Sequence, residues 1–391
     1  MPPSALVVPP PNVLAICPYF SQCGGCECQD VSYTDQLAAK QQWLTDLFAP
    51  LKPREVLPIL GSGKTYPTFF RNKIRFSFIE SEGIVWPSRH PKGSSKADIP
   101  IEKCFLHSEE ANRIIRATAT HATTHHWSLY NPETGSGWLK HLLIRQGKAT
   151  GQLMVVAITD QSPIPGLKDW ITAITAAAPV TSIYQGTSWG KELTTITDVH
   201  LWGDTCIHEK IGSYTFAISP QAFFQTNSEM VQMLYDAVAR AAGSGATLYD
   251  LYAGSATIGC YLSKQFENVH SIEVNPSNVA DALVNCQLNN VTNVSVSEGL
   301  VEDVATSAFI RESGTPDCVV VDPPRAGLHV RTRQLLVGLN LKKLVYVSCN
   351  PLTALRDIRE LTGGGYTLES LQPVDMFPHS WHAELVAVLT K

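Results

Sequence analysis

The N-terminal part of the chain holds four closely spaced cysteines, Cys17, Cys23, Cys26 and Cys28. The two glycines between the second and third cysteine let the backbone turn, so that successive thiolates can converge. The C-x5-C-x2-C spacing is more typical of an iron–sulfur cluster than of a zinc ribbon, which usually carries two C-x2-C pairs. A cluster needs a fourth ligand, and the spacing alone leaves two candidates, the nearby Cys28 and the distant Cys104.

A second kind of cysteine chemistry is indicated at Cys349, which follows an apolar run and directly precedes Asn350 and Pro351. Pro351 predicts the start of a helix, and a thiol at a helix N-terminus has a lowered pKa, which suits a nucleophile. The alternative is a buried structural cysteine. Asp322 follows another apolar run and is succeeded by two prolines, which cannot continue a strand and hold the loop in a fixed path.

A cofactor site is predicted where an apolar strand meets a glycine-bearing turn. The run 247–252 is followed by Gly254 and Gly259, and an acidic residue, Glu273, ends the next strand 19 residues after Gly254. Such an acid accepts hydrogen bonds from the two ribose hydroxyls of an adenosine-containing cofactor. The glycine pattern is G-x4-G, not G-x-G-x-x-G, so the tight turn that approaches a pyrophosphate is absent. S-adenosylmethionine carries no pyrophosphate, and the pattern therefore favours it over NAD.

The elements that position these residues alternate between strands and helices from about residue 230 onward. Expected strands cover 247–252, 269–274, 317–322 and 343–348, each followed by a turn and a helical segment. This alternation predicts a parallel, doubly wound α/β sheet, in which ligands bind at the carboxyl ends of the strands. Glu273, Asp322 and Cys349 all lie at such ends.

The first half of the chain has a different pattern of expected helices and strands. A helix is expected from Thr34, as its cap, to Phe48. Short alternating runs then predict a mainly antiparallel β domain with a helix over 109–118; the expected strands cover 73–79, 139–145, 153–159 and 181–184.

Composition and charge narrow the function classes. With 44% hydrophobic and 17% charged residues the chain is globular rather than disordered. It carries a net charge of −5, yet residues 51–150 hold 15 Lys/Arg against 8 Asp/Glu, which fits local contact with phosphates. No apolar run reaches the length of a membrane span, and no basic residue precedes Lys40 as a signal peptide would require. We expect a cytoplasmic protein, with no membrane partner and with reduced thiols rather than structural disulfides.

Several motifs taken together resemble the RNA 5-methyluridine (uracil-C5) methyltransferase family, over roughly residues 17–391. They are Ser219-Pro-Gln-Ala-Phe-Phe-Gln225-Thr-Asn227, Asp250-Leu-Tyr-Ala-Gly254, Ile272-Glu273, Asp322-Pro-Pro-Arg-Ala-Gly327, Val347-Ser-Cys349-Asn350-Pro351, Asp375-Met-Phe-Pro-His379 and His382-Ala-Glu384. The Ser-Cys-Asn-Pro and Asp-Met-Phe-Pro-His motifs are highly specific in combination. Two departures are mild: many members carry Phe where this chain has Tyr252 and Cys where it has Ala253.

The resemblance implies a fold, two cofactors and their ligands. It implies a Rossmann-like class I methyltransferase domain, a mainly antiparallel β central domain and a small N-terminal iron–sulfur segment. It implies a 4Fe-4S cluster on Cys17, Cys23, Cys26 and Cys104, with Cys28 as a non-ligand. It further implies that S-adenosyl-L-methionine is contacted by Gln225, Tyr252, Glu273 and Asp322.

The changes of pattern along the chain predict domain boundaries. We expect a cysteine-cluster segment over 1–33, a helical linker over 34–65 that packs on the methyltransferase domain, a central α+β RNA-binding domain over 66–205 that contributes Cys104, and the methyltransferase domain over 206–391. In the central domain, Phe70, Arg71, Lys73 and Arg75 place cations beside an aromatic ring, which suits phosphate contact and base stacking.

The implied reaction makes chemical sense with this chain's residues. Uracil C5 is a poor nucleophile, and attack of the Cys349 thiolate on C6 turns it into an enolate carbon that accepts a methyl group. Glu384 resembles the family's general base, which removes the C5 proton so that elimination frees Cys349. A paired uracil is unreachable, so the base must be flipped out. Asp322 can contact the base or hold the loop.

The substrate prediction rests on one departure from the family. Many members carry an N-terminal β-barrel before the cysteine cluster, whereas only 16 residues precede Cys17 here. The branch with a cluster and no barrel is similar to the 23S ribosomal RNA enzymes, so ribosomal RNA is the first expectation. The alternative is uridine 54 of tRNA. Two other classes stay open, an iron–sulfur NAD-binding redox protein and an RNA-binding module without chemistry. A monomer is expected.

Overall fold

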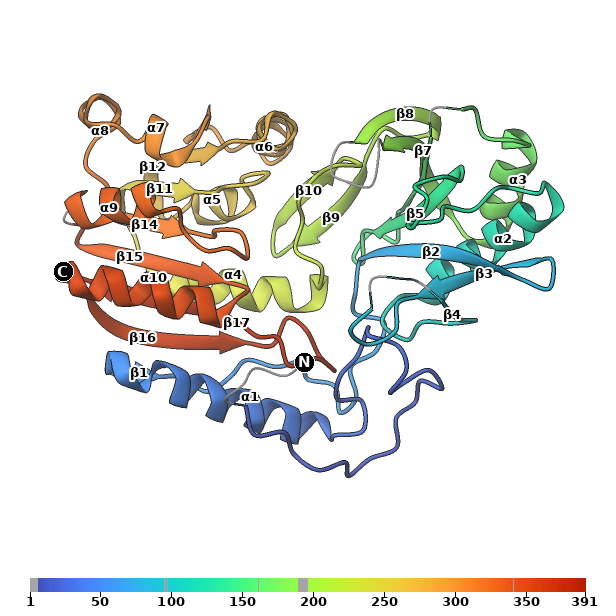
Figure 1. The fold of residues 1–391 in the computed structure, drawn as a ribbon. Helices are drawn as coiled ribbons and strands as arrows, with labels where there is room; N and C mark the ends of the chain where they lie inside the picture. The colour runs from blue at the N-terminus through green and yellow to red at the C-terminus, as the bar shows by residue number, and fades with distance from the viewer. Residues whose placement is uncertain (1–5, 95, 97, 161, 189–195, 340) are drawn as a thin grey trace.

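The chain folds into two lobes joined by an N-terminal segment that reaches both (Figure 1). The computed structural model describes residues 6–94, 96, 98–160, 162–188, 196–339 and 341–391. In those ranges, no helix is both long and apolar enough to cross a bilayer.

The larger lobe is built on an eight-stranded sheet with parallel strands at its centre, which confirms the predicted α/β class. Its strand order is β1-β16-β17-β15-β14-β11-β12-β13. From β15 to β13 all neighbours run parallel, while β17 is antiparallel to both β15 and β16. The strands are β1 (Glu55–Val56), β11 (Gly245–Leu251), β12 (Phe266–Glu273), β13 (Val294–Glu298), β14 (Cys318–Val321), β15 (Lys343–Ser348), β16 (Thr367–Val374) and β17 (Glu384–Thr390).

Helices cover both faces of this sheet because alternate residues of the buried strands face opposite ways. Leu248, Val320 and Val345 face a core shared with α4 and α5, whereas Val321 and Tyr346 face a core shared with α1 and α10. The helices of this lobe are α1 (Tyr33–Phe48), the 3-10 turn η1 (Ala49–Leu51), α4 (Ser228–Ala242), α5 (Thr257–Leu262), α6 (Pro276–Leu288), α7 (Val301–Val304), α8 (Ser307–Ser313), α9 (Val330–Leu339) and α10 (Pro351–Gly363).

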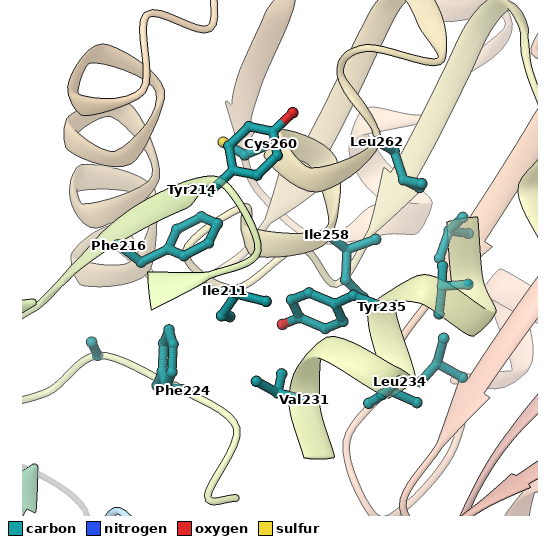
Figure 2. Packing of buried hydrophobic residues seen from close by; sticks show 14 of the residues in the cluster. Ile211, Tyr214, Phe216, Phe224, Val231, Leu234, Tyr235, Ile258, Cys260 and Leu262 are labelled. Carbon is teal, nitrogen blue, oxygen red and sulfur yellow. The ribbon is translucent and has the colours of Figure 1, made fainter. Parts of the chain in front are cut away.

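A two-stranded hairpin, β9 (Ile207–Ile211) and β10 (Tyr214–Ile218), leads from the smaller lobe into the larger one. Its apolar side chains pack into the first of these cores. Figure 2 shows Tyr214 and Phe216 of the hairpin in the same cluster as Val231 and Tyr235 of α4. The hairpin therefore fixes the start of α4 and the loop before it, residues 219–227.

The smaller lobe is a seven-stranded sheet with two helices on it. The strand order is β4-β3-β2-β5-β6-β7-β8, antiparallel throughout except for the pair β6 and β7, which α3 connects. Its elements are β2 (Lys73–Ser81), β3 (Ile84–Arg89), β4 (Ile99–Pro100), α2 (Glu109–Thr124), β5 (Leu139–Gln146), β6 (Leu153–Thr159), α3 (Leu167–Ala177), β7 (Val180–Ser188) and β8 (Ile196–Gly203).

Two local predictions differ from the structure. The cap of α1 is Ser32, whose hydroxyl accepts a hydrogen bond from the Asp35 amide, while Thr34 lies inside the helix. Phe70 is not available for base stacking, because its side chain is only 1% exposed. Arg75 is exposed on β2, on the face opposite the buried Ile74.

Candidate active site

Three predicted site residues meet at one edge of the large sheet. Asp322 follows β14 and Cys349 follows β15, and these strands are parallel neighbours. Strand β17 runs antiparallel to β15 with Ser348 opposite Leu385, so Glu384 begins β17 where β15 ends. The strand register alone therefore places the thiol beside the Glu384 carboxyl.

The turn that carries Cys349 is tied to the Asp-Pro-Pro-Arg loop. Asn350 caps α10 by accepting from the Leu352 amide at 3.3 Å, and its own amide group donates to the Arg325 carbonyl at 2.9 Å. The hydroxyl of Thr353, one turn into α10, donates to the same carbonyl at 3.2 Å. The turn that carries Cys349 is therefore tied to the loop after Asp322 by two hydrogen bonds.

The pKa of Cys349 is raised to about 11, mainly by burial and then by the charges of Glu384 and Asp322. The lowered pKa expected for a thiol at a helix N-terminus is thus outweighed here. Arg325 opposes the increase, mainly through its positive charge. Arg325 was not predicted as a site residue; its place three residues after Asp322, in the Asp-Pro-Pro-Arg loop, was the available signal.

Glu384 is a buried carboxyl poised to exchange a proton. It is 2% exposed, and its Oε2 atom has no hydrogen-bond partner among the described residues. Burial and then the charge of Asp322 raise its pKa to about 8, while Arg325 acts in the opposite direction. A group that titrates near neutral pH is suited to general acid–base chemistry.

Asp322 and Gln225 lie together at the same edge. The Gln225 side-chain amide lies 3.4 Å from Oδ2 of Asp322. Burial and the charge of Asp250 raise the pKa of Asp322 to about 7. Gln225 reaches this place because its loop is held from both lobes: Asn72 donates to the Gln225 carbonyl at 2.8 Å.

Asp250, which sequence reasoning did not single out, shapes the glycine-bearing turn. Its Oδ2 accepts from the Gly259 amide at 3.0 Å and from the Ser271 hydroxyl at 3.1 Å. A Cβ on Gly259 would approach these two side-chain oxygens to within 2.8 Å, which explains why a glycine stands there. A lone acid within an apolar strand was the signal that could have identified it.

Glu273 ends β12 beside this turn, as predicted. Its carboxylate accepts from the Gly254 amide at 2.8 Å and from the Asn275 amide at 2.8 Å. Each oxygen keeps a lone pair for a further donor, such as a ribose hydroxyl. Tyr252 is placed differently: its hydroxyl pairs with Thr332 of α9 at 2.9 Å, so only its ring is free to contact a cofactor.

The predicted cluster cysteines line one small cavity between the N-terminal segment and the smaller lobe. Cys17, Cys23, Cys26 and Cys104 all contribute to its wall, whereas Cys28 is fully buried among apolar residues around α1. The Gln29 side-chain amide donates to the Cys26 sulfur at 3.2 Å and the Gly25 amide to the Cys23 sulfur at 3.4 Å. Within the described ranges, no three His, Cys, Asp or Glu side chains form a site for a metal ion.

A family model and the sequence relatives of this chain all indicate RNA methyltransferases. A model described as tRNA (Uracil-5-)-methyltransferase matches residues 206–391. An uncharacterised RNA methyltransferase of Bacteroides thetaiotaomicron is 34% identical, covering 97% of this chain and 88% of the relative. One from Halalkalibacterium halodurans is 36% identical, with coverages of 97% and 84%.

A solved structure extends this match to three dimensions. The tRNA (uracil-54, C5)-methyltransferase of Pyrococcus abyssi, in complex with S-adenosyl-L-homocysteine, superposes with a TM-score of 0.77 at 29% identity and covers 94% of this chain and 86% of its own. From the sequence relatives, the family model and this superposition, the chain belongs to the RNA uracil-C5 methyltransferase family.

Proposed function

We propose that this protein transfers a methyl group from S-adenosylmethionine to C5 of one uridine in RNA, with Cys349 as the nucleophile and Glu384 as the general base. The observation that carries the proposal is the adjacency of a thiol and a buried carboxyl, Glu384, whose Oε2 atom has no hydrogen-bond partner among the described residues. Membership in an RNA methyltransferase family disfavours the NAD-binding redox alternative.

The residues divide the reaction between them. The Cys349 sulfur adds to uracil C6, and the electron pair of the C5–C6 double bond becomes an enolate that C5 uses as a nucleophile. S-adenosylmethionine supplies the methyl group. Glu384 then takes the C5 proton, the C6–S bond breaks, and Cys349 leaves as the thiolate. Arg325, through its positive charge near the thiol, favours the thiolate both at attack and at release.

The cofactor-binding roles follow the same edge of the sheet. We propose that Glu273 receives the ribose hydroxyls, that Gln225 and Asp322 lie at the methyl-bearing end, and that the Tyr252 ring lies against the cofactor. Support comes from the pair Gln225–Asp322 and from the backbone amides that orient Glu273.

We further propose a 4Fe-4S cluster on Cys17, Cys23, Cys26 and Cys104. The four thiols line one cavity, and amide groups donate to two of the sulfurs, which is the hydrogen bonding that tunes such clusters. A cluster keeps its own iron and sulfide atoms between the thiolates, so its ligands need not converge on one point. Such a cluster would be held by Cys17, Cys23 and Cys26 of the N-terminal segment and by Cys104 of the smaller lobe.

For the substrate, we propose a hairpin-loop uridine of 23S ribosomal RNA. Uridine 54 of tRNA is the second candidate, and its support is the structural similarity to the Pyrococcus abyssi tRNA enzyme. The basic stretch 51–150, with Arg75 exposed on β2, supports an RNA partner of either kind. The cytoplasmic location and the monomeric state remain predictions.

The test uses purified protein with S-adenosylmethionine and 5-fluorouridine-containing RNA, in which C5 has no proton to lose. We expect a stable protein–RNA adduct that Cys349→Ala abolishes and Cys318→Ala, at a buried cysteine of β14, leaves unchanged. Parallel reactions on unmodified large-subunit RNA and on unmodified tRNA, followed by mass mapping, decide the substrate. An adduct that persists in Cys349→Ala contradicts the mechanism.

A further inference from the structure

Side chains of helix α1 form hydrogen bonds with the segment that immediately precedes Glu384. Residues 375–383 connect β16 to β17, and the strand register pairs Val374, the last residue of β16, with Glu384, the first of β17. We name this segment the base-support loop. One of its ends follows Val374, the strand partner of Glu384, and the other directly precedes Glu384, so both ends lie next to this residue. Asp375 and His379 within it are 0% exposed.

One face of α1 supplies polar groups to this loop. Tyr33, Gln36 and Lys40 are three and four residues apart and so lie on the same side of the helix. Lys40 Nζ donates to Oδ1 of Asp375 at 2.6 Å, and both side chains are 0% exposed. The Tyr33 hydroxyl donates to Oδ2 of Asp375 at 2.9 Å, so the carboxylate is held through both oxygens.

The hydrogen bonds continue along the base-support loop. Lys40 Nζ also donates to the Phe377 carbonyl at 3.2 Å. Gln36 accepts from the His379 amide at 3.0 Å, and its amide group donates to the carbonyls of Cys28 and Val31 at 2.8 Å each. Gln36 therefore joins the loop to the N-terminal segment.

The N-terminal segment contacts the base-support loop directly as well. The Glu27 amide donates to the His379 carbonyl at 2.8 Å, and Oε2 of Glu27 accepts from the Trp381 amide at 3.1 Å. The His379 ring is held by the Pro67 carbonyl at 2.6 Å, with a positive φ of 64° at its own backbone. A left-handed conformation at a residue with a side chain persists only where its surroundings enforce it.

We infer that Lys40, Tyr33 and Gln36 are positioning residues for Glu384: they hold the base-support loop so that the carboxyl reaches the C5 proton. The inference rests on the proposed function, in which Glu384 acts after methyl transfer. The alternative is that these residues only stabilise the fold. In that case their loss would lower the rates of methyl transfer and of proton removal by the same factor.

The two roles differ in which step slows. Loosening the base-support loop displaces Glu384 but leaves Cys349 on its own turn, which the Asp-Pro-Pro-Arg loop holds. Attack and methyl transfer then continue, while proton removal slows and the methylated protein–RNA adduct accumulates. A purely structural defect lowers both rates in parallel and gives no such accumulation.

The experiment follows both steps with one RNA substrate that carries tritium at uridine C5. In a single turnover, methyl incorporation into total RNA, free and protein-bound, reports attack and transfer, and tritium release to water reports proton removal. For Lys40→Met we expect methyl transfer within twofold of wild type, tritium release slowed at least tenfold, and a methylated adduct that survives denaturing electrophoresis. Leu44→Ala, a buried apolar change on the same helix, is the control and should lower both rates equally.

Two further variants make the outcome decisive. Tyr33→Phe removes a single hydroxyl and should slow tritium release about threefold without slowing methyl transfer, which decides the matter if Lys40→Met does not fold. If Glu384→Gln accumulates the adduct but Lys40→Met and Tyr33→Phe behave like Leu44→Ala, the inference is wrong and the proposed function stands. If Glu384→Gln accumulates no adduct, the base assignment fails and the inference fails with it.

Discussion

At the scale of single residues, the site collects carboxyl groups that raise one another's pKa. Asp250 and Asp322 have pKa values raised to about 7, and Glu384 to about 8, each chiefly through burial. Arg325 is the positive group that acts against this at Glu384 and Cys349. We expect burial, together with the balance of these charges, to set the pH at which the Cys349 thiol and the Glu384 carboxyl are both ionised.

Two substitutions should move the pH profile in opposite directions. Asp322→Asn removes a negative charge that raises the pKa of Glu384 and Cys349, so the rise of single-turnover rate with pH should shift to lower pH. Arg325→Met removes the opposing positive charge and should shift it upward. The measurement is the rate at saturating cofactor between pH 6 and 10, and equal shifts in one direction would contradict this assignment of charges.

The raised pKa of Glu384 also predicts a stability effect. A carboxyl whose pKa is about 8 when folded, against about 4.3 when unfolded, binds its proton more tightly in the native state. Native stability therefore falls as pH rises from about 4 to 8. Glu384→Gln should raise the free energy of unfolding at pH 8 by on the order of 1–3 kcal/mol and change it little at pH 4. Denaturant titrations at both pH values check this, with the exposed Glu267→Gln as control.

At the scale of elements, those site residues could be predicted that lie at the carboxyl end of a strand recognisable from its own apolar sequence. Glu273, Asp322 and Cys349 each follow an apolar run, and parallel strands bring such ends to one edge. Glu384 lies at the amino end of an antiparallel strand, and only the family resemblance identified it. Phe70 was misjudged because its burial depends on packing that is invisible in the local pattern of charges and aromatics.

The glycine-bearing turn offers a test at this scale. Gly259→Ala places a methyl group against Asp250 and Ser271, so the turn must shift and the affinity for S-adenosylmethionine should fall at least tenfold. Gly338→Ala is the matched control, because a Cβ there meets nothing within 4 Å and alanine favours the helix by roughly 0.5–1 kcal/mol. Calorimetric titration of both variants checks the difference. Equal affinities would contradict the role given to this turn.

At the scale of the whole molecule, the chain joins segments that are distant in sequence, and individual polar contacts between such segments could not be predicted from local sequence patterns. Lys40 meets Asp375 across 335 residues, and β1 extends the sheet beside β16. A buried lysine and a buried aspartate look like surface residues when read singly, since only the partner makes their burial tolerable. No local sequence pattern therefore indicated that α1 forms hydrogen bonds with the base-support loop.

The cysteine cavity links the same distant parts, which leads to a prediction about the intact molecule. Three of its cysteines belong to the N-terminal segment, and Cys104 lies in the smaller lobe between β4 and α2. Cys23→Ser should abolish the visible absorbance of protein purified without oxygen and lower its melting temperature, because the proposed cluster would no longer hold the N-terminal segment to the smaller lobe. Cys28→Ala, at the buried cysteine outside the cavity, should keep the colour. Unchanged absorbance in Cys23→Ser, or loss of colour in Cys28→Ala alone, would mean that the ligand set is wrong.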